Sequence, residues 1–156
     1  MTPASLDITF TLNGEAAKAS VATHTLLIDF LRDTKGLRGV KRSCDMQVCG
    51  ACTVLMDGKP LSSCTTLAVD IDGATVTTIE GLGNADTLDP VQQAFLDHNA
   101  LQCGFCTPGF ILSVKALLQT NPKPTRAEIV HHLDGNLCRC TGYHKIIEAV
   151  ESLALS

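Results

Sequence analysis

Hydrophobic and polar residues alternate along residues 7–12 and again along residues 16–21, with Asn13-Gly14 between the two runs. Alternation with a period of two is typical of a β-strand that has one buried face. Asn-Gly is a preferred two-residue hairpin turn, because both positions readily adopt a positive φ. The pattern therefore predicts a β-hairpin near the start of the chain.

The rest of the first half repeats these strand signals on either side of a helical segment. A second hairpin is expected between Cys52 and Cys64, with its turn at Asp57-Gly58, and residues 74–80 are expected to form a short strand. Between the two hairpins, the leucines of residues 23–33 recur at helical spacing. Two hairpins with one helix packed across a sheet make a compact α+β unit.

Apolar residues in the second half recur at helical spacing, and capping signals mark where each helix begins. These signals place four helix starts at Asp89-Pro90, Thr107-Pro108, Thr125 and about Tyr143. A stretch rich in Gly and turn formers, Gly81 to Asp86, separates this half from the first. We therefore predict two domains, an α+β domain over residues 1–80 and an all-α domain over residues 81–156 whose helices form a four-helix bundle.

Composition and charge narrow the class of protein. The chain has 156 residues and a formal net charge of −4, with no block of like charges, which argues against nucleic acid as the main partner. It has neither a secretory signal pattern nor an apolar stretch of the roughly 18 residues that a membrane span needs. We therefore expect a cytoplasmic protein without a membrane span. In a reducing compartment, its eight cysteines favour metal binding or redox chemistry over disulfides.

The first group of cysteines has the spacing C-x4-C-x2-C with a distant fourth member. Its members are Cys44, Cys49, Cys52 and Cys64. This is the plant-type [2Fe–2S] spacing, in which two irons share four thiolates. A structural zinc site is the alternative, but zinc motifs usually pair two short C-x2-4-C units, which fits this run less well.

The second group of cysteines is ambiguous on spacing alone. It combines a C-x2-C unit with a C-x-C unit, and its members are Cys103, Cys106, Cys138 and Cys140. Zinc, another iron–sulfur cluster and a thiol relay are all compatible with it. A strain-free disulfide between Cys138 and Cys140 is not expected at that separation. Cys106 and Cys140 each precede a Thr and an expected helix N-terminus, where negative charge is favoured, so we expect an anionic cluster.

With both groups in place, the chain resembles a known family. The segments "CGACTV", "TIEGL", "LQCGFCTPG" and "GNLCRCTGY" match, in this order, the small iron–sulfur subunit of the molybdenum hydroxylases, or xanthine oxidase family. Aerobic carbon monoxide dehydrogenase and bacterial N-heterocycle and aldehyde dehydrogenases have similar subunits. The resemblance covers nearly the whole chain. It implies a β-grasp, plant ferredoxin-like first domain and a four-helix second domain, each holding one [2Fe–2S] cluster.

The resemblance also implies partners and a role in electron transfer. A large subunit would carry a molybdenum–pterin cofactor, expected as molybdopterin cytosine dinucleotide, and a medium subunit would carry FAD, in a dimer of heterotrimers. Electrons would pass from molybdenum to the helical-domain cluster, then to the ferredoxin-like cluster, and on to FAD or another acceptor. The chain would thus belong to an oxidoreductase, with no catalytic residue and no substrate turnover of its own.

Two further positions acquire a role from the resemblance, and one loop departs from it. Cys140, besides binding its cluster, and Gln102 match residues that contact the pterin. The alternative for Gln102 is an ordinary buried amide that bonds to backbone groups. The loop after Cys44 departs from the family pattern, since it is bulkier and less rich in glycine. We hypothesise that Met46 and Val48 cover the first cluster where the flavin subunit binds, and local packing is the alternative.

Two other functions remain open at this point. One is a structural or regulatory module with zinc in either cysteine group, and the other is a free-standing ferredoxin. A plain ferredoxin, however, has no need of the helical second half. The five histidines are scattered without ligand spacing and are expected at the surface or at helix caps.

Overall fold

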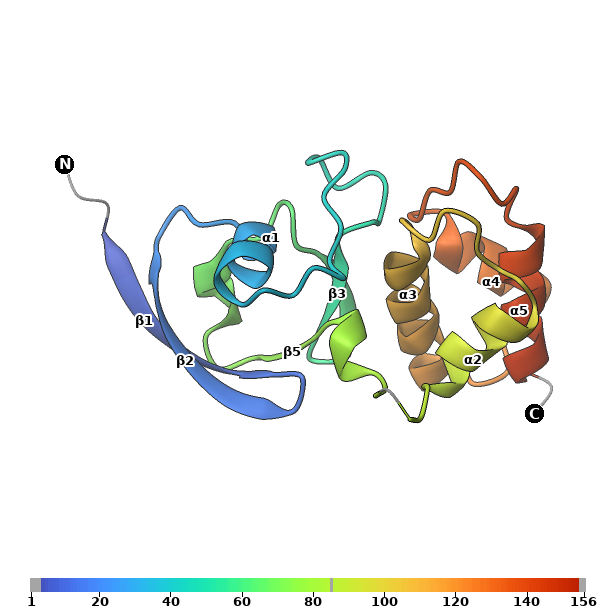
Figure 1. Ribbon diagram of the computed structural model, residues 1–156, viewed down its shortest axis with the longest axis horizontal. Helices are drawn as coiled ribbons and strands as arrows, with labels where there is room; N and C mark the ends of the chain where they lie inside the picture. Colours follow the sequence, from blue (N-terminus) through green and yellow to red (C-terminus); the bar gives the residue numbers. More distant parts are fainter. Residues whose placement is uncertain (1–3, 85, 155–156) are drawn as a thin grey trace.

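The computed structural model describes residues 4–84 and 86–154. Figure 1 shows a sheet-containing half and a helical half lying side by side, with the chain crossing once from the first to the second. The predicted boundary near residues 81–86 includes residue 85, which lies outside the described residues.

A five-stranded mixed sheet forms the first half. Its strands are β1 (Ser5–Leu12), β2 (Glu15–Ala22), β3 (Thr53–Met56), β4 (Lys59–Ser62) and β5 (Thr75–Thr77), arranged in the order β2-β1-β5-β3-β4. Both predicted hairpins are confirmed: β1 pairs antiparallel with β2, and β3 pairs antiparallel with β4. Asn13 and Asp57 adopt φ values of 52° and 50° in the two turns, as the Asn-Gly and Asp-Gly signals require.

One short helix covers the core of this half. It begins as α1 (Leu27–Asp29) and continues as a π-helical turn, Phe30–Thr34, so the predicted helix is present but shorter than its pattern. Leu27, Ile28 and Leu31 are fully buried against the sheet. Phe30 meets Phe10 of β1 edge to face, with ring centroids 5.7 Å apart. Two short 3-10 turns, Ala68–Ile71 and Ile79–Gly81, complete this half.

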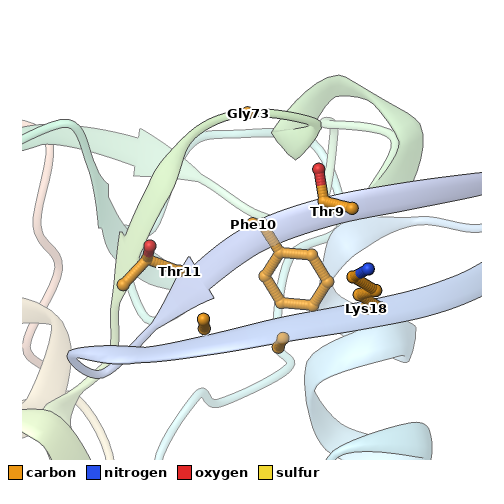
Figure 2. A pocket seen from close by; sticks show the side chains of 7 residues that line it. Thr9, Phe10, Thr11, Lys18 and Gly73 are labelled. Atoms are coloured by element: carbon orange, nitrogen blue, oxygen red, sulfur yellow. The ribbon is translucent and has the colours of Figure 1, made fainter.

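A shallow hollow lies over the first hairpin, far along the chain from most of the cysteines. Figure 2 shows Phe10 in it, with Thr9, Thr11 and Lys18 on the two strands and Gly73 on the loop that crosses them. Its lining is mainly aliphatic and hydroxyl side chains, with no cysteine. The hollow therefore has no part in the metal chemistry that the sequence predicts.

Four helices pack around a single apolar core in the second half. They are α2 (Pro90–Asp97), α3 (Thr107–Thr120), α4 (Arg126–Leu133) and α5 (His144–Ala154). The predicted caps of two of them are confirmed. The Asp89 side chain accepts from the Val91 amide at 2.9 Å, and Thr125 and Glu128 form a capping box.

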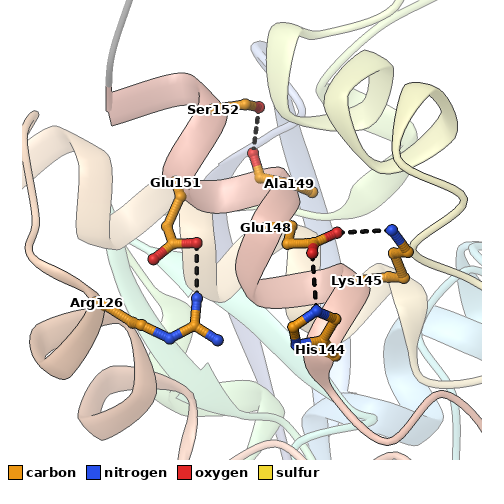
Figure 3. Close-up of polar contacts among 7 residues, drawn as sticks. All are labelled: Arg126, His144, Lys145, Glu148, Ala149, Glu151 and Ser152. Carbon is orange, nitrogen blue, oxygen red and sulfur yellow. Dashed lines mark hydrogen bonds and ion pairs between the residues drawn. The ribbon is translucent and has the colours of Figure 1, made fainter.

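Ion pairs fix the outer side of α5. Figure 3 shows Arg126, at the start of α4, bonded to Glu151 at 2.7 Å, while His144 and Lys145 both reach Glu148 one turn along α5. These pairs are largely exposed, so each contributes little stability. The Arg126–Glu151 pair joins α4 to α5, the helix whose preceding loop carries two of the cysteines.

The two halves meet through α3 and β3. Leu55 of β3 packs against Leu112 and Ala116 of α3, and all three side chains are buried. This small apolar contact joins the sheet to the helices. Across the described residues, no helix has both the length and the apolar character that crossing a membrane requires.

Candidate metal centres

The first group of cysteines lies on a tightly wound loop before β3 and just after β4. Cys52 and Cys64 are buried, whereas Cys44 and Cys49 are half-buried. The loop winds through left-handed backbone at Asp45, Gln47 and Gly50, with φ values of 54°, 59° and 68°. Such turns point successive N–H groups inward, toward an anion. Consistent with this, the Val48 amide donates to the Cys44 sulfur at 3.4 Å.

The cysteines of this group differ in burial, and their pKa values shift in opposite directions. Hydrogen bonds from backbone amides, with Met46 the strongest, lower the pKa of Cys44 to about 6. Burial raises the pKa of Cys52 to about 11, so its thiolate needs a positive partner. A bound metal ion supplies that charge, because it deprotonates a coordinating thiol outright. Cys49 lies close enough to Cys44, and Cys64 close enough to Cys52, to affect the pKa of its neighbour.

Side chains from outside the loop hold it in place. Arg42 forms an ion pair with Asp29 of α1 and donates to Asp45 at 3.0 Å. The Thr65 hydroxyl, next to Cys64, donates to the Gln47 side chain at 3.1 Å. These contacts tie the loop both to the helix and to the segment that carries the fourth cysteine.

The second group of cysteines comes from two loops, one before α3 and one before α5. The sulfurs of Cys103 and Cys140 lie 3.6 Å apart, both at the exposed side. Cys106 lies deeper, and burial followed by its contact with Cys138 raises the pKa of Cys106 to about 12. The four cysteines of this group line one hollow.

The separation of the Cys103 and Cys140 sulfurs suits two thiolates bound to the same metal atom. Metal–sulfur bonds of about 2.3 Å at a tetrahedral angle place two sulfurs on one metal about 3.8 Å apart. A [2Fe–2S] cluster needs two thiolates on each of two irons, and the donor set of each group fits it.

Hydrogen bonds around Cys138 fix the deeper side of the second group. The Thr141 hydroxyl donates to the Cys138 sulfur at 3.0 Å, and the Thr141 amide donates to the same sulfur at 3.4 Å. Burial opposes ionisation of Cys138, but these bonds outweigh it and the net pKa lies below that of an ordinary thiol. The Cys138 amide donates to the hydroxyl of Tyr143 at 2.9 Å, and the Tyr143 ring packs edge to face on Phe110.

The expected helix N-terminus is present at one cysteine and absent at the other. Cys106 is the N-cap residue of α3, as predicted. The prediction was wrong for Cys140, because α5 begins only at His144. Gly142 and Tyr143 adopt φ values of 64° and 66°, and this left-handed turn delays the helix. Negative charge on this loop is therefore stabilised by individual hydrogen bonds and not by a helix terminus.

Comparison with known proteins bears on both halves. Residues 16–95 match the family described as a 2Fe-2S iron-sulfur cluster binding domain, and residues 78–151 match a second [2Fe-2S] binding domain. The chain is 48% identical, over 93% of its length and 87% of the relative, to the nicotine 6-hydroxylase small subunit of Paenarthrobacter nicotinovorans. It is 47% identical to the nicotinate dehydrogenase small FeS subunit of Eubacterium barkeri, over 93% and 92% of the two chains.

The chain belongs to the small iron–sulfur subunits of the molybdenum hydroxylases. It is therefore an electron-transfer subunit of an oxidoreductase complex. A chain in the crystal structure of quinoline 2-oxidoreductase from Pseudomonas putida 86 has the same fold, with a TM-score of 0.92 and 44% identity. The match covers 97% of this chain and 93% of that one.

Two residues that the family resemblance associates with the pterin lie at the surface. Gln102 is exposed, so the alternative of a buried amide is wrong. Cys140 is exposed as well, and it lines a hollow shared with Cys103, Phe105 and Arg139. In the isolated chain, both side chains are therefore accessible to a partner subunit.

The side chains of the first loop that depart from the family pattern are also exposed. Met46 is 67% exposed and Val48 is 53% exposed. Packing within this chain therefore does not explain their apolar character, which leaves contact with another subunit as the open hypothesis. Asp45 and Gln47 occupy left-handed positions that favour glycine, so the loop is more strained than a glycine-rich one.

Three polar residues near the cysteines were missed at the level of sequence. Thr141 was noted only as a supposed helix start, and Ser113 and Asn136 were not singled out. Ser113 and Asn136 are both buried and bonded to each other, with exposures of 4% and 5%. The local signal for Ser113 is a polar residue within a mostly apolar stretch of helix. The local signal for Asn136 is its place beside a cysteine motif. Their partners come from distant parts of the chain.

Proposed function

We propose that this chain holds two [2Fe–2S] clusters. Cys44, Cys49, Cys52 and Cys64 would bind the first, and Cys103, Cys106, Cys138 and Cys140 the second. The observation that carries the proposal is the meeting of the four cysteines of the second group around one hollow, with 3.6 Å between the sulfurs of Cys103 and Cys140. The match of each half to a [2Fe-2S] binding domain supports one cluster in each.

The proposed domains follow the two apolar cores. Residues 1–80 would form a β-grasp, ferredoxin-like domain and residues 81–156 a four-helix bundle domain. The separate core of each half supports this division, since one core ends at Val76 and the other begins at Val91. We propose that the chain acts in the cytoplasm, because a reducing compartment keeps cysteines available as metal ligands.

The chain would relay electrons between two larger partners. Each cluster, when bound, supplies one-electron acceptance and release. The exposed side of the second group, with Cys140 and Gln102, would face the molybdenum–pterin cofactor of a large subunit, proposed as molybdopterin cytosine dinucleotide. The exposed loop with Met46 and Val48 would face an FAD-carrying medium subunit. The apolar exposure of this loop supports a protein contact there.

The complex would be a dimer of heterotrimers, and the role of this chain within it would be limited to electron transfer. Substrate binding and turnover are assigned to the large subunit. The test is purification of the native complex through a tag on this chain, followed by measurement of molybdenum, flavin and iron. We expect all three to copurify with two larger chains. Purification of the chain alone, with iron but without molybdenum, would contradict the proposed assembly and favour a free-standing ferredoxin.

A further inference from the structure

The loops of the two cysteine groups touch directly, and one buried side chain links them. The Asn136 side chain, 5% exposed, lies two residues before Cys138. Its Oδ1 accepts from the Ser113 hydroxyl of α3 at 2.9 Å, and its Nδ2 donates to the Gly50 carbonyl at 3.3 Å. Gly50 directly follows Cys49, so one amide links the helical half to the first cysteine loop.

We call the contact of residues 136–137 and Gly109 with residues 49–50 the joint. The backbones approach so closely there that the two glycines have no room for a side chain. The Leu137 amide donates to the Cys49 carbonyl at 2.9 Å. A Cβ on Gly109 of α3 would lie 2.2 Å from the Gly50 carbonyl oxygen, and a Cβ on Gly50 would lie 2.3 Å from Asn136 Nδ2. No side chain fits between the two loops at these points. The spacing of the loops is therefore set by backbone contact and by the amide that spans it.

Directional bonds and apolar packing have different effects at this joint. The cluster of Leu55, Leu112 and Ala116 holds the halves together, but hydrophobic contact has no preferred direction and tolerates sliding. Hydrogen bonds require defined distances and angles. A buried amide whose oxygen and nitrogen are both paired permits only one register. Asn136, together with the backbone bond from the Leu137 amide to the Cys49 carbonyl, therefore supplies the geometric constraint that the apolar contact lacks.

We propose that Asn136 is a positioning residue that sets the separation and orientation of the two clusters. The inference rests on the proposed function, because it requires a cluster in each cysteine group. Cys49 belongs to the first group and Cys138 directly follows Leu137, so a shift at the joint moves one group relative to the other. Ser113 acts through Asn136 by holding its oxygen, which leaves Nδ2 pointing to Gly50.

The test uses the purified complex with Asn136→Asp. This change keeps the size of the side chain and its acceptor for Ser113, but it sets a carboxylate oxygen against the Gly50 carbonyl. The matched control is Asn13→Asp. Asn13 makes the same kind of bridge within the first half, donating to and accepting from Thr78 at 3.0 Å and 2.8 Å. Its φ of 52° suits Asp as well as Asn.

Two readouts report on the joint and not on activity. With both clusters reduced, paramagnetic resonance measures the magnetic interaction between them, which falls with the cube of their distance. We expect Asn136→Asp to lose resolved splitting while both cluster signals and the iron content remain. Hydrogen exchange of the peptide containing the Leu137 amide should become roughly tenfold faster. Asn13→Asp should change neither readout.

The outcomes separate this inference from the function on which it rests. Unchanged splitting and unchanged Leu137 exchange in Asn136→Asp would overturn the positioning role, even with both clusters present. Absence of two cluster signals in the unmodified complex would instead overturn the proposed function. If Asn136→Asp does not assemble, Ser113→Ala provides the same test, because it removes one hydroxyl and leaves the backbone contacts in place. Unchanged splitting and exchange in Ser113→Ala would likewise overturn the role.

Discussion

Thr141→Val tests how the protein tunes the cluster that we assign to the helical half. The Thr141 hydroxyl donates to the Cys138 sulfur at 3.0 Å, and valine keeps the shape of the side chain without the donor. A hydrogen bond to a ligand sulfur stabilises the more negative, reduced cluster and so raises its reduction potential. A bond that is about 1 kcal/mol stronger in the reduced than in the oxidised state corresponds to on the order of 40 mV for a one-electron couple. We expect the potential of this cluster to fall by about that amount, measured by redox titration with paramagnetic resonance.

Two control variants isolate the hydroxyl. Thr141→Ser keeps the donor and should leave the potential near that of the unmodified complex. Thr107→Val changes the corresponding threonine after Cys106, whose hydroxyl makes no bond to a sulfur among the described residues, and should have no effect. The Thr141 amide still donates to the same sulfur in every variant. An unchanged potential in Thr141→Val, or an equal shift in the ferredoxin-like cluster, would refute the reasoning.

Three further substitutions test other parts of the structure. Gly109→Ala gains about 1 kcal/mol of helix propensity but forces a Cβ to 2.2 Å from the Gly50 carbonyl, so we expect a net loss and a lower unfolding temperature by calorimetry. A higher temperature would show that the joint can open without cost. Cys49→Ser should remove only the first cluster's paramagnetic signal and Cys138→Ser only the second's, whereas equal loss of both from either change would contradict independent sites. Thr125→Ala should weaken the start of α4 by about 1 kcal/mol, seen as faster hydrogen exchange of that helix, and unchanged exchange would contradict the role of the cap.

Local signals predicted the elements of this fold well because the residues that decide them are adjacent in the chain. Asn13-Gly14 set the first hairpin through backbone conformation, and Asp89 set the start of α2 through a bond two residues away. The start of α5 was predicted to within one residue, but Cys140 was wrongly placed at its N-terminus because Thr141 follows a cysteine as Thr107 does. Its hydroxyl bonds to the Cys138 sulfur instead, and a left-handed turn at Tyr143 postpones the helix.

Contacts between distant loops could not be predicted from the residues that make them. Spacing placed Cys103 and Cys140 in one group, but their pairing depends on how two loops 37 residues apart are brought together. Asn136 and Gly50 lie 86 residues apart, and nothing in either local sequence indicates the other. Such contacts follow from the packing of α3 on β3, which is decided by the whole fold.

The most direct test of the two-cluster assignment is a joint measurement of iron and acid-labile sulfide on the anaerobically purified complex. We expect about four irons and about four sulfides per copy of this chain after subtraction of other iron sites, with two distinct paramagnetic signals on reduction. Zinc in place of iron, or iron without labile sulfide, would contradict the assignment of both cysteine groups.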